Sequence, residues 1–89
     1  KIVVVGSAIQ NNIEEIVLVR YHDDGSLDTT FGNQGIVYTS INICAQASAI
    51  ALQSTGEIVI TGTTTSDYNI YSLFIMRYTT EGNLDPTFN

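Results

Sequence analysis

Basic residues and cysteines are scarce in this chain of 89 residues. Three basic residues face nine acidic ones, and the net charge of −6 would repel the phosphates of nucleic acids and the anionic surface of a membrane. The single cysteine, Cys44, excludes an internal disulfide and a zinc site built from several thiolates. We therefore expect no nucleic-acid partner and no disulfide framework.

The sequence also lacks a long apolar run. No stretch approaches the roughly 20 residues that a membrane-spanning helix needs, and no secretory signal pattern is present, so we expect no membrane insertion. Phosphate-binding glycine loops and dinucleotide fingerprints do not occur either, and we expect no cofactor. The chain opens directly on the apolar run Ile2–Gly6, which suggests a segment of a longer protein.

What the chain does contain is a repeat. The stretch "RYHDDGSLDTTF" at 20–31 and the stretch "RYTTEGNLDPTF" at 77–88, 57 positions later, share Arg, Tyr, Gly, Leu, Asp, Thr and Phe. Upstream, the runs "IVVVG" and "IVITG" align at an offset of 56. Because loops tolerate insertions, we expect the one-residue slip to lie in a loop between Gly6 and Glu15. Fixed-period similarity indicates stacked units, each covering a face that its neighbour cannot cover alone.

Runs rich in β-branched and aromatic residues predict strands. They are Ile2–Val5, Ile16–Tyr21, Gly35–Thr39, Ile58–Thr61 and Leu73–Tyr78. The stretch Ala45–Gln53 is compatible with a helix by composition and with a strand by alternation. Because a tight connection at Gly56 follows it, we predict a strand over Ala47–Gln53 that forms a hairpin with the next one, and a helix is the alternative.

Four antiparallel strands per period predict the blade of a β-propeller. The predicted fold is therefore all-β, a propeller segment of about one and a half four-stranded antiparallel blades. Residues 1–40 would supply strands 2 to 4 of one blade, and residues 45–89 would supply strands 1 to 3 of the next.

The repeated stretch reads as a strand end, a turn and a return to the core. Gly25 and Gly82 would supply a positive φ at the turn. The paired arginine and aspartate of each copy predict a charge-assisted hydrogen bond, or a bond from the aspartate to nearby backbone N–H groups, that holds the turn. The structural repeat motif consists of Arg20, Tyr21, Gly25, Leu27, Asp28 and Phe31, and of Arg77, Tyr78, Gly82, Leu84, Asp85 and Phe88.

These motifs resemble the delta-sixty repeat, a bacterial β-propeller repeat, and the resemblance covers nearly the whole chain. "ALQSTGEIVITG", "LFIMRYTTEGNLDPTFN" and "LVRYHDDGSLDTTFGNQGIV" carry it. The second copy departs from the pattern at Glu81, Asn83, Pro86 and Asn89, and Glu57 stands where lysine is usual. The resemblance implies a scaffold in a large secreted or surface-associated bacterial protein, without an assigned catalytic activity.

Some residues offer chemistry, and each also has a plain structural interpretation. Asp23, Asp24 and Asp28 surround a turn and could hold calcium, but their counterparts lose one carboxylate, and a plain turn is the preferred interpretation. His22 beside Asp23 could act as a general base, although a solvated surface histidine is the simpler interpretation. Cys44 lies in an apolar segment without cationic neighbours and reads as a small buried or half-buried hydrophobe.

We expect a non-catalytic structural or interaction module of a larger repeat protein. Its partners would be neighbouring repeats of the parent chain, or further copies that pair through strand edges, and its location extracellular or at the cell surface. The alternative is a carbohydrate- or protein-binding propeller that uses the loops Ser7–Glu14 and Thr63–Ile70. Asp67, Tyr68 and Tyr71 are the candidate ligand-binding residues for that alternative.

Overall fold

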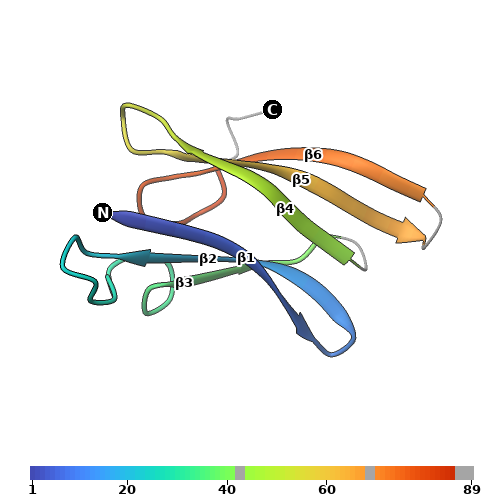
Figure 1. The fold of residues 1–89 in the computed structure, drawn as a ribbon, viewed down its shortest axis with the longest axis horizontal. Helices are drawn as coiled ribbons and strands as arrows, with labels where there is room; N and C mark the ends of the chain where they lie inside the picture. Colours follow the sequence, from blue (N-terminus) through green and yellow to red (C-terminus); the bar gives the residue numbers. More distant parts are fainter. Residues whose placement is uncertain (42–43, 68–69, 86–89) are drawn as a thin grey trace.

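The computed structural model describes residues 1–41, 44–67 and 70–85, and these residues form an all-β structure, as predicted (Figure 1). The strands are β1 (Ile2–Gln10), β2 (Ile13–Tyr21), β3 (Ile36–Thr39), β4 (Cys44–Leu52), β5 (Ile58–Asp67) and β6 (Ile70–Tyr78). Within the described residues, no helix is long and apolar enough to cross a membrane.

The strands form two consecutive antiparallel units. In the first unit, residues 1–41, β2 pairs with β1 and β3, and in the second unit, residues 44–85, β5 pairs with β4 and β6. Among the described residues, one parallel pair, Glu14 with Cys44, joins β2 to β4. Figure 1 shows β4, β5 and β6 lying over β1, β2 and β3 as a second layer.

The ambiguous alanine-rich stretch is strand β4, so the helix alternative is wrong. Its small side chains allow a close approach between the β4 and β5 backbones. A Cβ atom placed on Gly62 of β5 would lie 2.0 Å from the carbonyl oxygen of Gln46. The β4–β5 register shifts between Ala47 and Ala49 at the same place, which is the signature of a β-bulge.

The loops predicted at Ser7–Glu14 and Thr63–Ile70 are wrong, because most of these residues continue the strands. In the first unit, β1 and β2 meet at a two-residue turn of Asn11 and Asn12, with φ values of 53° and 65°. Such left-handed pairs match the twist of a hairpin, and asparagine tolerates them. Ser7 and Gln10 lie at exposed positions of β1, whereas Thr64 and Thr65 of β5 are buried.

The one-residue slip between the copies lies in a strand and not in the expected loop. β5 shifts its register against β6 between Thr65 and Asp67, whereas β1 pairs with β2 without a break from Ile2 to Gln10. A β-bulge therefore absorbs the extra residue of the second copy.

The hydrophobic core lies between the two units. Its fully buried members are Ile16, Leu18 and Phe31 from the first unit and Ala45, Ile58, Ile60 and Tyr78 from the second. Each unit thus supplies one apolar face, and burial of both depends on their contact.

Candidate interaction surface

Both copies of the repeat fold into the same turn after the strand that carries the arginine. In the first copy, the His22 N–H donates to the Ser26 carbonyl and the Gly25 N–H donates to the His22 carbonyl. Thr79, Gly82 and Asn83 repeat both bonds in the second copy. Gly25 and Gly82 have φ values of +91° and +97°, the left-handed conformation that glycine adopts without strain.

The predicted hydrogen bond between arginine and aspartate is present in both copies. Arg20 Nε donates to Asp28 Oδ2 at 2.9 Å, and Arg77 Nε donates to Asp85 Oδ2 at 2.8 Å. Asp28 also accepts bonds from the backbone N–H and the hydroxyl of Thr30, so both predicted types of bond occur there.

The buried Asp28 carboxylate is held in its charged form. Hydrogen bonds from Lys1, Thr30 and Arg20 keep the pKa of Asp28 well below its usual range, although burial acts in the opposite direction. The Arg20 guanidinium in turn lies over the Phe31 ring, 4.5 Å from its centroid. The charged pair therefore fixes the guanidinium in one orientation.

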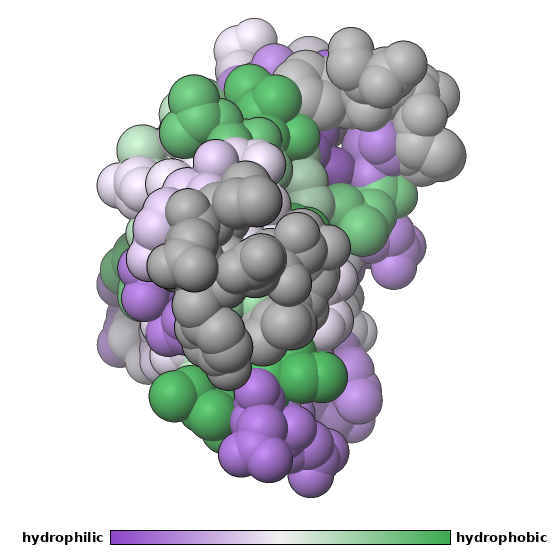
Figure 2. Space-filling model, turned by 90° about the vertical axis from the view of Figure 1, so that its right-hand side faces the viewer, coloured by the Kyte–Doolittle hydropathy of each residue, from purple (hydrophilic) through white to green (hydrophobic). Residues whose placement is uncertain are grey.

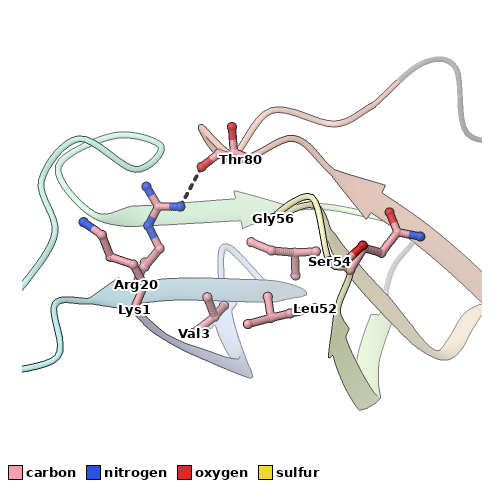
Figure 3. Close-up of a pocket in the computed structure, with 9 residues that line it drawn as sticks. Lys1, Val3, Arg20, Leu52, Ser54, Gly56 and Thr80 are labelled. Carbon is pink, nitrogen blue, oxygen red and sulfur yellow. Dashed lines mark hydrogen bonds between the residues drawn. The ribbon is translucent and has the colours of Figure 1, made fainter.

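Arg20 also reaches across to the second unit, which sequence reasoning missed. Its Nη1 donates to the Thr80 carbonyl oxygen at 2.6 Å (Figure 3). Beside it, the Gly32 N–H donates to the Glu81 carbonyl at 2.7 Å. The second unit's turn, residues 79–83, therefore lies in a socket on the first unit, which we define as Arg20, Phe31, Gly32 and Val37.

The socket leaves little space for a side chain on the turn. A Cβ atom on Gly82 would lie 3.0 Å from the Gly32 nitrogen and 3.0 Å from Val37 Cγ2. The recurrence of arginine and glycine in both copies was the available sequence signal, but it pointed only to a local turn.

A cleft of about 240 Å³ opens beside the socket between the units, lined by Lys1, Val3, Arg20, Leu52, Gln53, Ser54, Gly56, Ile58 and Thr80 (Figure 3).

Polar contacts join the units elsewhere as well. Thr39 and Tyr78 share a hydrogen bond of 2.6 Å between their hydroxyl oxygens. At the β2–β4 junction, Cys44 Sγ donates to the Glu14 carboxylate at 2.6 Å, and Gln46 Nε2 contacts the same carboxylate. This bond to Glu14 is the main reason that the pKa of the Cys44 thiol is raised, and burial adds to it. Cys44 is half-buried, as predicted.

Comparison with known families agrees with this architecture. A family model described as "Domain of unknown function (DUF5122) beta-propeller" matches residues 1–31 and 53–88. The chain belongs to this β-propeller family. Each matched segment contains two paired strands followed by residues of the repeated turn. No curated protein and no solved structure matched the chain.

Equivalent positions of the two propeller units differ sharply in burial. Ile16 and Leu18 of β2 are 0% exposed, whereas Leu73 and Ile75, which occupy the same repeat positions in β6, are 85% and 58% exposed. Register places Val59, Leu73, Ile75 and Arg77 on one face of β5 and β6. We call this set the second-unit face.

On the opposite side of the molecule, the residues of the first unit are exposed and their equivalents in the second unit are buried. Ile58 and Ile60 of β5 are 0% exposed, whereas their counterparts Ile2 and Val4 in β1 are 47% and 50% exposed. Together with Val19 and Tyr21 of β2, which pair with Val4 and Ile2, they form what we call the first-unit face. Hydrophobic side chains reach the surface in separate patches in the view of Figure 2.

The residues proposed for calcium or acid–base chemistry are engaged in the turn. Asp24 Oδ1 accepts bonds from the backbone and side chain of Ser26. His22 is half-exposed, and its Nε2 lies 3.8 Å from Asp28 Oδ1. Among the described residues, no group of three or more histidine, cysteine, aspartate or glutamate side chains is placed to hold a metal ion.

The candidate ligand-binding residues are described only in part. Tyr68 lies outside the described residues, as does Phe88 of the repeat motif, and the side chain of Asp67 at the end of β5 is likewise outside the described part. Tyr71 is 71% exposed and borders a cavity of about 150 Å³, whose other lining residues are Cys44, Gln46, Thr63, Thr64 and Thr65.

Proposed function

We propose that the chain is a non-catalytic structural and interaction module of a larger β-propeller built from repeats of the delta-sixty type. Residues 1–40 would form strands 2 to 4 of one blade, and residues 45–89 would form strands 1 to 3 of the next. Neighbouring repeats of the same kind are the partners of its two open faces. By its resemblance, the parent protein would be secreted or surface-associated.

The observation that carries this proposal is the difference in burial between equivalent residues. Ile16 and Leu18 are covered by the second unit, and Leu73 and Ile75 repeat them at an exposed face. Exposing such large aliphatic side chains is costly, at about 1.5–3 kcal/mol per residue relative to burial. A further unit stacked on the second-unit face would remove that cost, as the second unit does for the first.

The polar residues of the motif support a structural role. Arg20 and Asp28 bind each other. Asp28 also accepts bonds from Thr30 and Lys1, and Arg20 also lies over the Phe31 ring and donates to the Thr80 carbonyl. These contacts hold the turn and the neighbouring unit in place. They account for the recurrence of the motif without a substrate.

Tyr71 offers an alternative, a carbohydrate site at the cavity of about 150 Å³. However, Tyr71 occupies the repeat position of Glu14, which contacts Cys44 and Gln46 of the following unit. Because Glu14 connects the first unit to the second, the equivalent Tyr71 would connect the second unit to a further one. Binding of the parent protein to a glycan array that is lost with Tyr71→Ala would favour the carbohydrate alternative.

The proposal is tested by adding a third unit to the chain. A second copy of residues 33–89 is appended after position 89, which preserves the period of 57, with Asn89→Gly to match Gly32 and its φ of +55°. We expect chemical denaturation to show a larger m-value and a free energy of unfolding raised by about 3 kcal/mol or more, because two large aliphatic residues become buried.

Lysine substitutions at Leu73 and Ile75 provide the control. In the 89-residue chain both side chains are exposed, so the double substitution should change the free energy of unfolding by no more than about 0.5 kcal/mol per site. In the extended chain the same change should remove most of the gained stability. Equal effects in the two chains would contradict the proposal.

A further inference from the structure

We propose that the edge of β1 facing away from β2 is a docking site for one more antiparallel strand, and that Gly6 selects a strand built like β4: uncharged, rich in small residues and bulged opposite the glycine. This inference rests on the proposed function, because such a strand would come from a neighbouring repeat. It adds the chemistry of that strand and names the residue of this chain that would recognise it.

The second unit shows how the equivalent edge is covered. β5 pairs with β6 on one side and with β4 on the other (Figure 1). β1 occupies the repeat position of β5 and pairs with β2 in the place of β6, but no further strand among those described pairs with it. The backbone N–H and C=O groups on such an edge are a template for another strand. The β4–β5 interface therefore defines what β1 can accept.

The glycine sets the shape of the incoming strand. The repeat offset of 56 places Gly6 at the position of Gly62, which pairs with Ala47 of β4. The register of β4 shifts between Ala47 and Ala49, and beside this bulge the Gln46 carbonyl oxygen takes the place that a Cβ on Gly62 would need. A Cβ on Gly6 would meet nothing within 4 Å. The space that β4 fills beside Gly62 is therefore open beside Gly6.

Side-chain size and charge narrow the partner further. β4 carries no charged residue and has alanine at 45, 47, 49 and 51, so its backbone can approach a neighbouring strand closely. β1 likewise contains no charged residue and no proline, and it pairs with β2 without a bulge. Charges, prolines and bulges are the features that keep an edge strand from pairing. Because the chain has a net charge of −6, an acidic partner strand would be repelled.

Docking would also cover apolar surface on β1. Ile2 and Val4 are 47% and 50% exposed, whereas Ile60, the counterpart of Val4, is 0% exposed. In the second unit, Ile50 of β4 lies opposite Ile60 and packs against the core. Side chains directly opposite each other on paired strands are in contact. An apolar residue of the docked strand would therefore cover part of Val4.

An extension at the start of the 89-residue chain tests the proposal. Residues 45–56 are copied before Lys1, which stands at the repeat position of Glu57, so the added strand would meet β1 in the register of β4 and β5. Only alternate residues of an antiparallel strand direct their N–H groups toward a given neighbour. We therefore expect hydrogen exchange, measured by NMR, to slow about tenfold or more at alternate β1 amides, and the midpoint of urea unfolding to rise.

The role of the glycine is tested by Gly6→Ala in both chains. In the 89-residue chain the added methyl has free space, so the urea midpoint should stay the same or rise slightly. In the extended chain the methyl would clash with a carbonyl of the docked strand, so the same substitution should lower the midpoint and remove the new protection. Ile9→Ala is the matched control, because the partner of its equivalent, Thr65, is Cys44, which the extension omits. Its effect should be equal in both chains.

A second extension separates strand pairing from the mere presence of added residues. It carries Ala49→Pro and Ile50→Pro within the added segment. Because adjacent residues direct their N–H groups to opposite sides, one proline removes a donor that would face β1. The bond between the free amino group of Lys1 and Asp23 is lost in both extensions, so it does not affect their comparison. The proline extension should give neither slower exchange nor a higher midpoint.

The outcomes separate this inference from the proposed function. Alternate β1 amides that exchange equally fast in the extended and 89-residue chains, or equally slowly with the proline extension, overturn docking at this edge. An effect of Gly6→Ala with the same sign in both chains overturns selection by the glycine. In each of these cases a stabilised three-unit chain, which is lengthened at the other end, would still support the proposed function. The proposed function fails if that three-unit chain gains no stability.

Discussion

At the scale of single residues, Asp28 connects most of the groups that shape the first turn. Its carboxylate has no exposed surface and accepts bonds from Arg20, Lys1 and Thr30. The pKa of Asp28 in the folded chain lies below the ordinary value of 3.8, because those bonds favour the charged form. The folded state therefore binds a proton at this site less readily than the unfolded state does.

This difference predicts a loss of stability in acid. The contribution of Asp28 is fully present above the unfolded pKa of about 3.8 and is lost as the pH falls through the lower folded pKa. We expect the free energy of unfolding, measured by urea denaturation between pH 7 and pH 2, to fall below about pH 4. Asp28→Asn should lower stability at pH 7 and flatten this decline. An unchanged pH profile in Asp28→Asn would show that other carboxylates cause the decline.

At the scale of elements, the two copies differ in what lies beside β1 and beside β5, its equivalent in the second copy. β5 is flanked by β4, and the β4 backbone approaches Gly62 so closely that no Cβ fits there. Gly6 occupies the same repeat position in β1, and a Cβ there would meet nothing within 4 Å. Among the described strands, β1 pairs only with β2. The same glycine is thus essential for packing in one copy and unconstrained in the other.

Alanine substitutions at these two glycines should have opposite effects. Gly62→Ala forces the β4 and β5 backbones apart and should lower the free energy of unfolding by about 3 kcal/mol. Gly6→Ala adds no clash and restricts the unfolded chain, so it should raise stability by about 0.5 kcal/mol. Denaturant unfolding of the two variants in parallel measures the difference. Similar losses in both variants would contradict the strand arrangement.

At the scale of the whole molecule, stability depends on contact between the units. The fully buried residues come from both units, and the socket encloses the turn at 79–83. Because neither unit covers its own apolar face, we expect them to unfold together in one transition.

Alanine substitutions at Gly25 and Gly82 separate two contributions to stability, the docking of the turn in the socket and the backbone strain within the turn. Gly25→Ala and Gly82→Ala introduce the same strain at a positive φ, about 1–2 kcal/mol each. Gly82→Ala additionally crowds Gly32 and Val37 and should cost about 1–3 kcal/mol more. Thermal and urea unfolding at concentrations low enough to keep the chain monomeric provide the comparison. Equal losses would mean that the socket contributes little to stability.

The sequence by itself determined the features that depend on neighbours close along the chain. Strands rich in β-branched residues, glycine turns and the Arg–Asp bond eight residues apart were all predicted, because each involves a local backbone preference or a short-range contact. The repeat also predicted equivalent backbones at both turns, and these are present.

Only the tertiary structure decided which strands and surfaces of the two copies are paired and which are buried. The polar continuations of the strands, the bulge between Thr65 and Asp67 and the bond from Arg20 to Thr80 depend on pairing with distant segments. Identical repeat positions are buried at Leu18 and exposed at Ile75, since burial depends on whether another unit covers them. A repeated sequence specifies equivalent surfaces, and the positions of the units along the stack determine which of those surfaces is covered.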